Sequence, residues 1–279
     1  MSVLLQISDT HFGTEQAPVM QALQRLHAEL QPDVVVVSGD ITQRATRAQF
    51  QSARQFFDSL NPKALLAIPG NHDIPLFNPV LRLLAPYAHF QQAFGRDLQP
   101  EFTADDLLIV CVNTTRRWRH KHGEVSPAQI QYVAQRLTTA NAAQLRVIVT
   151  HQPVHIITEK DSVNLLRGYQ PALQAWAQAG ADLILGGHIH LPYVRPLGPL
   201  PQQPHQTLWA VQAGTALSAR TRSGLPNSVN VVRYQNTDNR RNCSVQQWDF
   251  DQHSNEFKPV AITSLVSSPD SCRPPHSAT

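Results

Sequence analysis

Five short apolar runs in this sequence are each followed at once by side chains that can bind a cation. These side chains lie in Ser8-Asp9-Thr10-His11, Ser38-Gly39-Asp40, Pro69-Gly70-Asn71-His72-Asp73, Thr150-His151 and Gly186-Gly187-His188-Ile189-His190. Taken singly, each motif reads most simply as a turn, a helix cap or a surface histidine. The recurrence of carboxylate, imidazole and amide groups after five strand-like runs favours one shared metal site instead.

The candidate ligands offer oxygen and imidazole donors and no thiolate, which suits first-row ions such as Fe, Mn or Zn. They are Asp9, His11, Asp40, Asn71, His151, His188 and His190. Seven ligands are too many for one ion that keeps an open position, so we expect two ions that share one carboxylate. Because only two ligands are anionic, two divalent or trivalent ions would leave the site positive. A positive site binds phosphate oxygens and lowers the pKa of bound water.

Alternating strands and helices position these motifs. We expect strands at residues 3–7, 34–37, 64–68, 107–112, 145–149 and 182–185, and helices at 19–30, 46–60, 78–94 (interrupted at Pro86), 126–139 and 164–179. This alternation predicts a largely parallel sheet, in which ligands bind beyond the carboxyl ends of the strands. After residue 191, prolines exclude helix, and runs at 207–212, 228–234 and 244–250 predict antiparallel strands.

Bulk properties narrow the classes of protein. The length of 279 residues predicts a single domain over residues 1–266, and the Ser- and Pro-rich stretch 267–279 predicts a disordered tail. A net charge of +3 gives no sign of a nucleic-acid polymer as partner. The sequence has no apolar run of about 18 residues, so no membrane span is expected. A cytoplasmic protein, which could form a homo-oligomer, is the default expectation.

In order and spacing, the five motifs resemble those of the calcineurin-like metallophosphoesterase superfamily, over residues 3–191. The resemblance implies an α/β fold: a four-layer α/β/β/α sandwich of two mixed sheets flanked by helices. The opening at residues 7–12, the segment 39–42 and the acid at Asp73 are most similar to the bacterial cyclic-nucleotide phosphodiesterase (class III) group, which includes glycerophosphodiesterases. The implied activity is hydrolysis of small phosphodiesters, in which a hydroxide generated at the metals attacks phosphorus.

The resemblance also implies a role for each residue. One metal would be held by Asp9, His11 and His190, the second by Asn71, His151 and His188, and Asp40 would bridge both. The side chain of His72 would face the phosphate and assist the leaving oxygen, and Asp73 would orient His72.

The basic loop at residues 116–122 also follows a predicted strand. Within it, Arg116, Arg117 and Trp118 are candidates for contacts with a phosphate or a base, and a solvated basic loop is the alternative. Two other functions stay open. One is a phosphomonoesterase or nucleotide phosphatase on the same site. The other is a non-catalytic scaffold of the same fold, which the complete ligand set and His72 disfavour.

Overall fold

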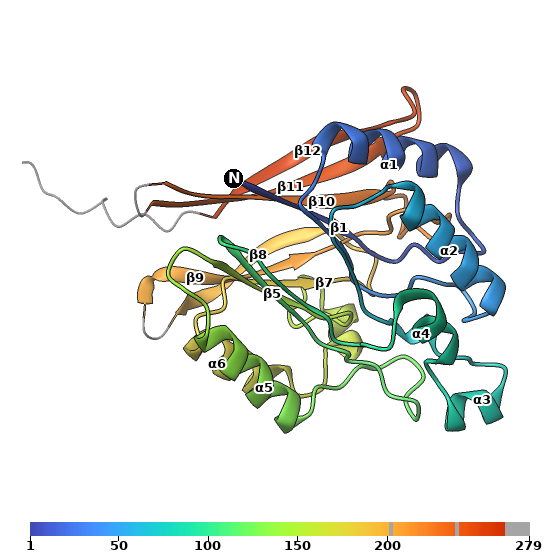
Figure 1. Ribbon diagram of the computed structural model, residues 1–279, viewed down its shortest axis with the longest axis horizontal. Coiled ribbons are helices and arrows are strands. Elements are labelled where there is room, and N and C mark those ends of the chain that lie inside the picture. Colours follow the sequence, from blue (N-terminus) through green and yellow to red (C-terminus); the bar gives the residue numbers. More distant parts are fainter. Residues whose placement is uncertain (201–202, 238–239, 266–279) are drawn as a thin grey trace, which may run out of the picture.

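Two sheets packed face to face form the centre of the protein, as the computed structural model in Figure 1 shows; it describes residues 1–200, 203–237 and 240–265. Within these ranges the first sheet has six strands in the order β12-β11-β10-β1-β2-β3. Its strands are β1 (Ser2–Ile7), β2 (Val34–Val37), β3 (Leu65–Ala67), β10 (Ser228–Thr237), β11 (Arg240–Asp251) and β12 (Glu256–Ser264). The pairs β1–β2 and β2–β3 are parallel, and the remaining pairs are antiparallel.

The second sheet has the order β4-β5-β6-β7-β9-β8. Its strands are β4 (Glu101–Thr103), β5 (Leu107–Cys111), β6 (Leu145–Val149), β7 (Leu183–Gly186), β8 (Tyr193–Leu200) and β9 (Gln203–Gln212). The run β5-β6-β7-β9 is parallel, whereas β4 and β8 join its edges antiparallel. Both sheets are therefore mixed, and the predicted fold class is confirmed.

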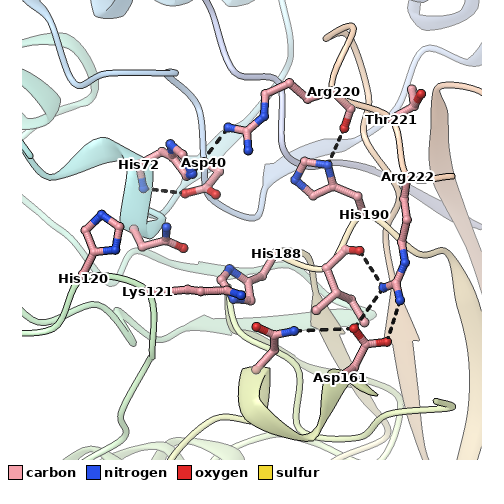
Figure 2. Close-up of a pocket in the computed structure, with 13 residues that line it drawn as sticks. Asp40, His72, His120, Lys121, Asp161, His188, His190, Arg220, Thr221 and Arg222 are labelled. Atoms are coloured by element: carbon pink, nitrogen blue, oxygen red, sulfur yellow. Dashed lines mark hydrogen bonds and ion pairs between the residues drawn. The ribbon is translucent and has the colours of Figure 1, made fainter. Parts of the chain in front are cut away.

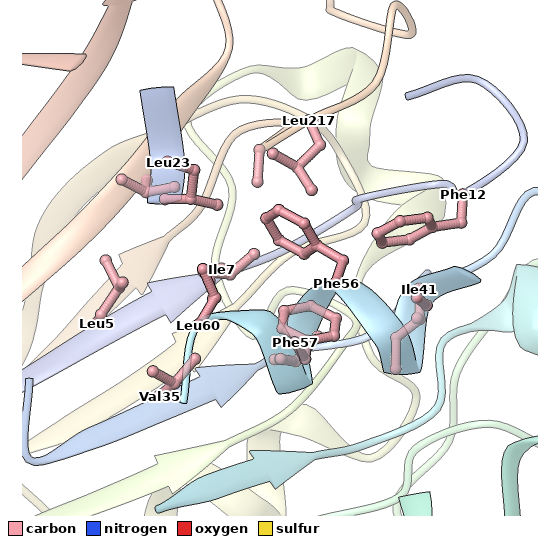
Figure 3. Packing of buried hydrophobic residues seen from close by; sticks show 14 of the residues in the cluster. Leu5, Ile7, Phe12, Leu23, Val35, Ile41, Phe56, Phe57, Leu60 and Leu217 are labelled. Atoms are coloured by element: carbon pink, nitrogen blue, oxygen red, sulfur yellow. The ribbon is translucent and has the colours of Figure 1, made fainter. Parts of the chain in front are cut away.

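The alternation of side chains along each strand explains the layers. On β2, Val34 and Val36 belong to the core between the sheets, whereas Val35 and Val37 belong to the core under the helices. A strand that is buried on both faces reads as an unbroken apolar run, as this one does. Figure 3 shows the helix-side core, in which Phe56 and Phe57 pack over the first sheet.

Helices cover both outer faces. The first sheet packs against α1 (Ala17–Leu30) and α2 (Arg47–Ser59). The second sheet packs against α5 (Pro127–Thr138) and α6 (Tyr169–Gln178). The start of α5 is the one that its sequence predicts, because Ser126 caps the helix and Gln129 completes a capping box.

Some boundaries differ from those predicted. Pro86 divides the segment 78–94, as predicted, into α3 (Pro79–Leu84) and α4 (Ala88–Phe94). The helix predicted at 164–179 begins only at Tyr169, because Gly168 has a left-handed backbone (φ 84°), and a short 3-10 helix, η2 (Glu159–Asn164), precedes it. Three edge strands, β4, β8 and β12, were not predicted. The predicted tail 267–279 lies outside the described residues. In the described part of the chain, no helix is long and apolar enough to cross a membrane.

A buried ion pair joins the two sheets. Arg241 on β11 donates two hydrogen bonds, of 3.0 and 2.6 Å, to the carboxylate of Asp182, which precedes β7. Both side chains are only 11% exposed. We expect Arg241→Met to lower the free energy of unfolding by about 3–5 kcal/mol, because Asp182 would stay buried without its charged partner. Urea denaturation measures this loss.

The matched control is Lys258→Met, which removes a surface ion pair with Asp251. Exposed pairs contribute little to stability, so this variant should unfold at nearly the wild-type urea concentration. Equal midpoints for both variants would show that the pair between the sheets contributes no more than a surface pair.

Candidate metal centre

The structure brings all seven predicted ligands to one edge of the sandwich, where the parallel strands end. They follow β1 (Asp9, His11), β2 (Asp40), β3 (Asn71, in the 3-10 turn η1, Asn71–Asp73), β6 (His151) and β7 (His188, His190). Their donor atoms form two clusters small enough to hold a cation, Asp9 with His11 and His190 and Asp40 with His151 and His188. A third cluster joins His11 and Asp40 to His72, which is not one of the seven. The arrangement is therefore one of two neighbouring sites that meet at Asp40.

The distances place Asp40 between the two groups. One of its carboxylate oxygens lies 3.3 Å from Nε2 of His151, and the other lies 3.9 Å from Nε2 of His11. In the first group, Oδ1 of Asp9 lies 3.3 Å from Nε2 of His190, and the Nε2 atoms of His11 and His190 are 3.2 Å apart. Two imidazole nitrogens so close to each other and to a carboxylate are well placed for one shared cation.

Backbone carbonyls fix the orientation of two of these imidazoles. The carbonyl of Ser38 lies 2.8 Å from Nδ1 of His151, and the carbonyl of Arg220 lies 2.6 Å from Nδ1 of His190. A carbonyl only accepts, so each Nδ1 carries the hydrogen and each Nε2 keeps its lone pair for the cluster. Histidines that bind metals are commonly held in this way.

Several donor atoms have no hydrogen-bond partner although they are buried. Among the described residues these include Oδ1 of Asn71 and Nε2 of His188, and Nε2 of His151 makes no well-formed hydrogen bond although it lies 3.3 Å from the Asp40 carboxylate. A buried polar atom without a partner is costly, and native proteins rarely tolerate one without a reason. All three atoms belong to the predicted second metal site, so a cation would satisfy them together. The residues present therefore fit a metal centre.

The electrostatics support the same interpretation. Burial alone would raise the pKa of the Asp9 and Asp40 carboxyls, but the charges of His190 and His151 override it and hold both pKa values low. Burial opposes protonation of His151, yet the Asp40 carboxylate raises its pKa to about 9. In His188, by contrast, burial lowers the pKa to about 3. Two ionised carboxylates thus give the site a strong attraction for positive charge.

The backbone of the ligands is strained. Five of the seven have positive φ angles, namely Asp9 (52°), His11 (42°), Asp40 (49°), His188 (73°) and His190 (54°). Each such residue costs of order 1–3 kcal/mol, and such residues gather at functional sites. Close packing adds a second constraint, because a Cβ on Gly70 would overlap the backbone nitrogen and a carboxylate oxygen of Asp40.

The contacts of Asp73 run to the backbone of two loops. Its buried carboxylate accepts hydrogen bonds from the backbone nitrogens of Gly70 (2.8 Å), Ile41 (3.0 Å) and Thr42 (2.8 Å). Burial and the nearby Asp40 raise its pKa to about 6, although these hydrogen bonds oppose the rise. The ring of His72 is held instead by the carbonyl of Gln43, 3.1 Å from Nδ1. Asp73 therefore fastens the loops after β2 and β3 to each other and does not orient the His72 ring directly.

A cavity of about 530 Å³ opens over the clusters, and Figure 2 shows the side chains that line it. Asp40, Asn71, His72, His188 and His190 form its floor and sides. Other parts of the chain add polar groups to the lining: His120, Lys121, Asp161, Asn164, Arg220, Thr221 and Arg222. The cavity therefore joins the metal clusters to a largely cationic wall.

The basic loop meets the cavity through residues other than the three predicted substrate contacts. Arg116, Arg117 and Trp118 are not part of this cavity's lining, although His120 and Lys121 of the same loop are. The guanidinium of Arg116 donates to the carbonyls of Asn113 and Thr115 and to Gln129, and that of Arg117 donates to the carbonyl of Leu83. The guanidinium of Arg116 thus ties the loop to itself and to α5, and that of Arg117 ties it to α3.

Two cationic residues of the cavity were missed by sequence reasoning. Arg220 and Arg222 lie between β9 and β10, far in sequence from the motifs. The guanidinium of Arg222 is paired with Asp161, with two contacts of 3.1 and 3.0 Å. Nη1 of Arg220 lies 2.7 Å from Oε1 of Gln43 and 3.4 Å from Nε2 of His72. Their only sequence signal was Arg-x-Arg before Gly224, which carries no information about location.

Comparison with known proteins supports a common origin. The chain is 30% identical over 169 residues to a glycerophosphodiester phosphodiesterase from Enterobacter lignolyticus, which covers 54% of this chain and 57% of that protein. It is 24% identical over 202 residues to a cAMP/cGMP dual specificity phosphodiesterase from Mycobacterium tuberculosis, which covers 67% of this chain and 61% of that protein. These matches span about three fifths of the length of either relative.

Solved structures share the fold at low sequence identity. A dimetal phosphatase from Danio rerio superposes with a TM-score of 0.64 at 15% identity, covering 96% of this chain and 99% of that one. A purple acid phosphatase from yellow lupin gives 0.69 at 12% identity, covering 100% of this chain and 57% of that one. A family model for calcineurin-like phosphoesterases matches residues 2–192. With its motifs, its two mixed sheets and this match, the chain belongs to the calcineurin-like phosphoesterase family.

Proposed function

We propose that this protein is a two-metal phosphodiesterase that hydrolyses small diesters of the cyclic-nucleotide or glycerophosphodiester type. The observation that carries the proposal is the pair of donor clusters that meet at Asp40, with buried donor atoms that lack partners. The activities named for the two bacterial relatives, both phosphodiesterases, support the choice of a diester.

The residues divide between the two ions as the clusters do. Asp9, His11 and His190 would hold one, Asn71, His151 and His188 would hold the other, and Asp40 would hold both. When bound, two first-row ions such as Fe, Mn or Zn supply Lewis acidity to the phosphate oxygens and make water a nucleophile near neutral pH.

The protein's own side chains bind and orient the substrate. Arg220 and Lys121 reach the cavity from opposite sides in Figure 2 and can bind phosphate oxygens. Since the Gln43 carbonyl holds Nδ1–H of His72, Nε2 is the atom that points to the reacting group. In its protonated form, His72 would donate that Nε2 proton to the departing ester oxygen.

A phosphomonoesterase on the same site is the second candidate, and one observation favours it. A monoester is a dianion, so its binding benefits from more than one cationic group. In the cavity lining, Asp161 neutralises Arg222, and this leaves the charges of Lys121 and Arg220 for the substrate. A non-catalytic scaffold is disfavoured, because the full ligand set and His72 are gathered at the cavity.

The direct test compares bis(p-nitrophenyl) phosphate with p-nitrophenyl phosphate after loading the protein with manganese. We expect kcat/KM for the diester to exceed that for the monoester by at least about tenfold, a difference of about 1.4 kcal/mol in transition-state binding. Cyclic nucleotides and glycerophosphodiesters then identify the type of diester. A preference for the monoester would favour the second candidate, and no hydrolysis of either would revive the scaffold.

Replacing Arg220 tests the binding role of the cationic wall. Arg220→Ala should lower kcat/KM for the diester by about 10- to 100-fold, because a charge-assisted hydrogen bond contributes about 1.5–3 kcal/mol. The carbonyl that holds His190 is part of the backbone and remains, so the metal content should not change. Arg25→Ala is the matched control, since Arg25 contacts Asn255 outside the cavity. Equal activity of both variants would remove Arg220 from the substrate site.

A further inference from the structure

The short helix α3 exposes the face that a helix normally buries. Val80, Leu83 and Leu84 occupy positions i, i+3 and i+4, which form one stripe, and they are 65, 60 and 75% exposed. Phe77, just before the helix, is 73% exposed. An apolar stripe at this spacing usually faces a core, yet α3 has no buried residue at all.

A tryptophan extends this surface. Trp118 is 66% exposed. The residues directly before and after it, Arg117 and Arg119, are both hydrogen-bonded to α3. The guanidinium of Arg117 donates to the carbonyl of Leu83 (2.7 Å), and that of Arg82 donates to the carbonyl of Arg119 (2.6 Å). We call this surface the apolar lip; it consists of Phe77, Val80, Leu83, Leu84 and Trp118. Large apolar side chains that are exposed in neighbouring segments are typical of an interaction site.

The lip adjoins the cavity and projects from the body of the protein. The chain runs directly from His72 in the cavity lining to Phe77, and from Trp118 to Lys121, which also lines the cavity. In Figure 1, α3 stands at an outer corner, beyond α4 and away from both sheets. A flat partner could therefore rest on the lip without meeting the rest of the sandwich.

The surroundings of the lip are cationic. Three basic side chains lie against the lip or the segments that carry it, and no ion pair involves them in the described part of the chain: Arg44, Arg82 and Arg117. Other arginines of the neighbouring segments are compensated, since Arg54 pairs with Asp58 and both Arg116 and Arg119 pair with Glu124. The guanidinium of Arg44 lies over the ring of Phe77, 4.9 Å from its centroid. The partner must therefore be both apolar and anionic.

A second copy of the chain fits this surface poorly. In a symmetric dimer the same patch faces itself, so the three arginines that lie against the lip would oppose their own copies. A bilayer with anionic headgroups offers acyl chains to the apolar side chains and negative charge to the basic ones. We propose that the apolar lip binds the surface of an anionic lipid bilayer, so that the mouth of the cavity lies beside the headgroups. This inference goes beyond the proposed diester hydrolysis and does not depend on it.

Co-sedimentation of the full chain with lipid vesicles tests the proposal. We expect binding to vesicles of phosphatidylcholine mixed with phosphatidylglycerol, much weaker binding to phosphatidylcholine alone, and loss of binding as salt is raised. The double variant Val80→Ser/Leu84→Ser should lower the partition coefficient by at least about tenfold, because it removes two apolar side chains from the contact. Val260→Ser/Ile262→Ser should bind as the wild type does, since these exposed residues lie on β12.

Three outcomes would overturn the proposal. The wild type could fail to bind anionic vesicles, or both double variants could lose binding equally. The wild type could also fail to bind vesicles but form a concentration-dependent dimer in sedimentation velocity, and the Val80/Leu84 variant could abolish that dimer. In that case the lip would contact a second copy of the chain. The far-UV circular dichroism spectrum and the thermal unfolding midpoint serve as the check on folding, and Phe77→Ser replaces the double variant if that variant fails it. Vesicle binding and hydrolysis of bis(p-nitrophenyl) phosphate can fail independently, so the test separates this proposal from the proposed function.

Discussion

Asp40→Asn should deprive the purified protein of bound metal and lower kcat for a diester by at least about a thousandfold. Asp40 is the residue at which the two clusters meet, and its oxygens face His11 and His151. The amide keeps the size of the side chain and an oxygen that can accept the 2.8 Å hydrogen bond from the backbone nitrogen of His72. Only the charge and one oxygen donor are removed, so the loss would report on metal binding and not on collapse of the loop. Elemental analysis after manganese loading and dialysis measures it.

The matched control for Asp40 is Asp33→Asn. Asp33 is also a carboxylate beside the first sheet, but it pairs with Lys63 and with the backbone nitrogen of Val3, away from the clusters. This variant should keep the metal content and kcat of the wild type. If Asp40→Asn retained two metals per chain and normal hydrolysis, Asp40 could not be the ligand that both sites share.

The ligand edge could be predicted from the sequence because its cause is local. Parallel strands end at a common edge, so a polar motif directly after a buried run, such as Asp40 after β2, must lie there. The layers follow for a similar reason, since alternate side chains of an apolar strand such as β2 face opposite cores. Both inferences need only residue type and order along the chain.

The features of the site that could not be predicted depend on contacts between segments far apart in the sequence. No periodicity connects Arg220 to His72, yet the fold brings Nη1 of Arg220 to 3.4 Å from the His72 ring. The left-handed backbone of Asp9 and His11 has no sequence signature either, because neither residue is glycine. The contacts of Asp73 also depend on distant segments. Its position next to His72 in sequence suggested a contact with that ring, but its carboxylate accepts hydrogen bonds from backbone nitrogens of two loops.

Arg220 links the two halves of the proposed mechanism through different atoms. Its backbone carbonyl fixes the imidazole of His190 for a metal, and its side chain reaches into the cavity beside His72. The segment between β9 and β10 therefore holds a candidate ligand in place and, in the proposed function, would also supply a cation for the substrate. This segment begins beyond residue 192, where the match to the family model ends, so it is a place where this chain can acquire its own substrate preference.

His72→Ala should keep two metals per chain and still lower kcat for an alkyl diester by about 10²- to 10⁴-fold, the usual contribution of a positioned proton donor. The donor cluster of His72 with His11 and Asp40 leaves the opposite outcome open, in which His72 is itself a ligand. The carbonyl of Gln43 holds the ring so that Nε2 faces the cavity, beside Arg220, in agreement with a role at the leaving oxygen. Elemental analysis together with kcat distinguishes the two roles.

The leaving group provides the sharpest readout of that role. A p-nitrophenolate departs without a proton, whereas an alkoxide such as that of glycerol needs one, so the loss in His72→Ala should be much larger for glycerophosphodiesters than for bis(p-nitrophenyl) phosphate. His89→Ala is the matched control, because Nδ1 of His89 also contacts a backbone carbonyl, that of Ala45, at 2.9 Å, but His89 lies outside the cavity. Loss of metal in His72→Ala, or an equal loss of rate with both leaving groups, would exclude the proton-donor role. If His72→Ala keeps its metals and loses more rate with the alkyl diester than with the nitrophenyl diester, metal binding cannot explain the difference, since both substrates meet the same metal centre.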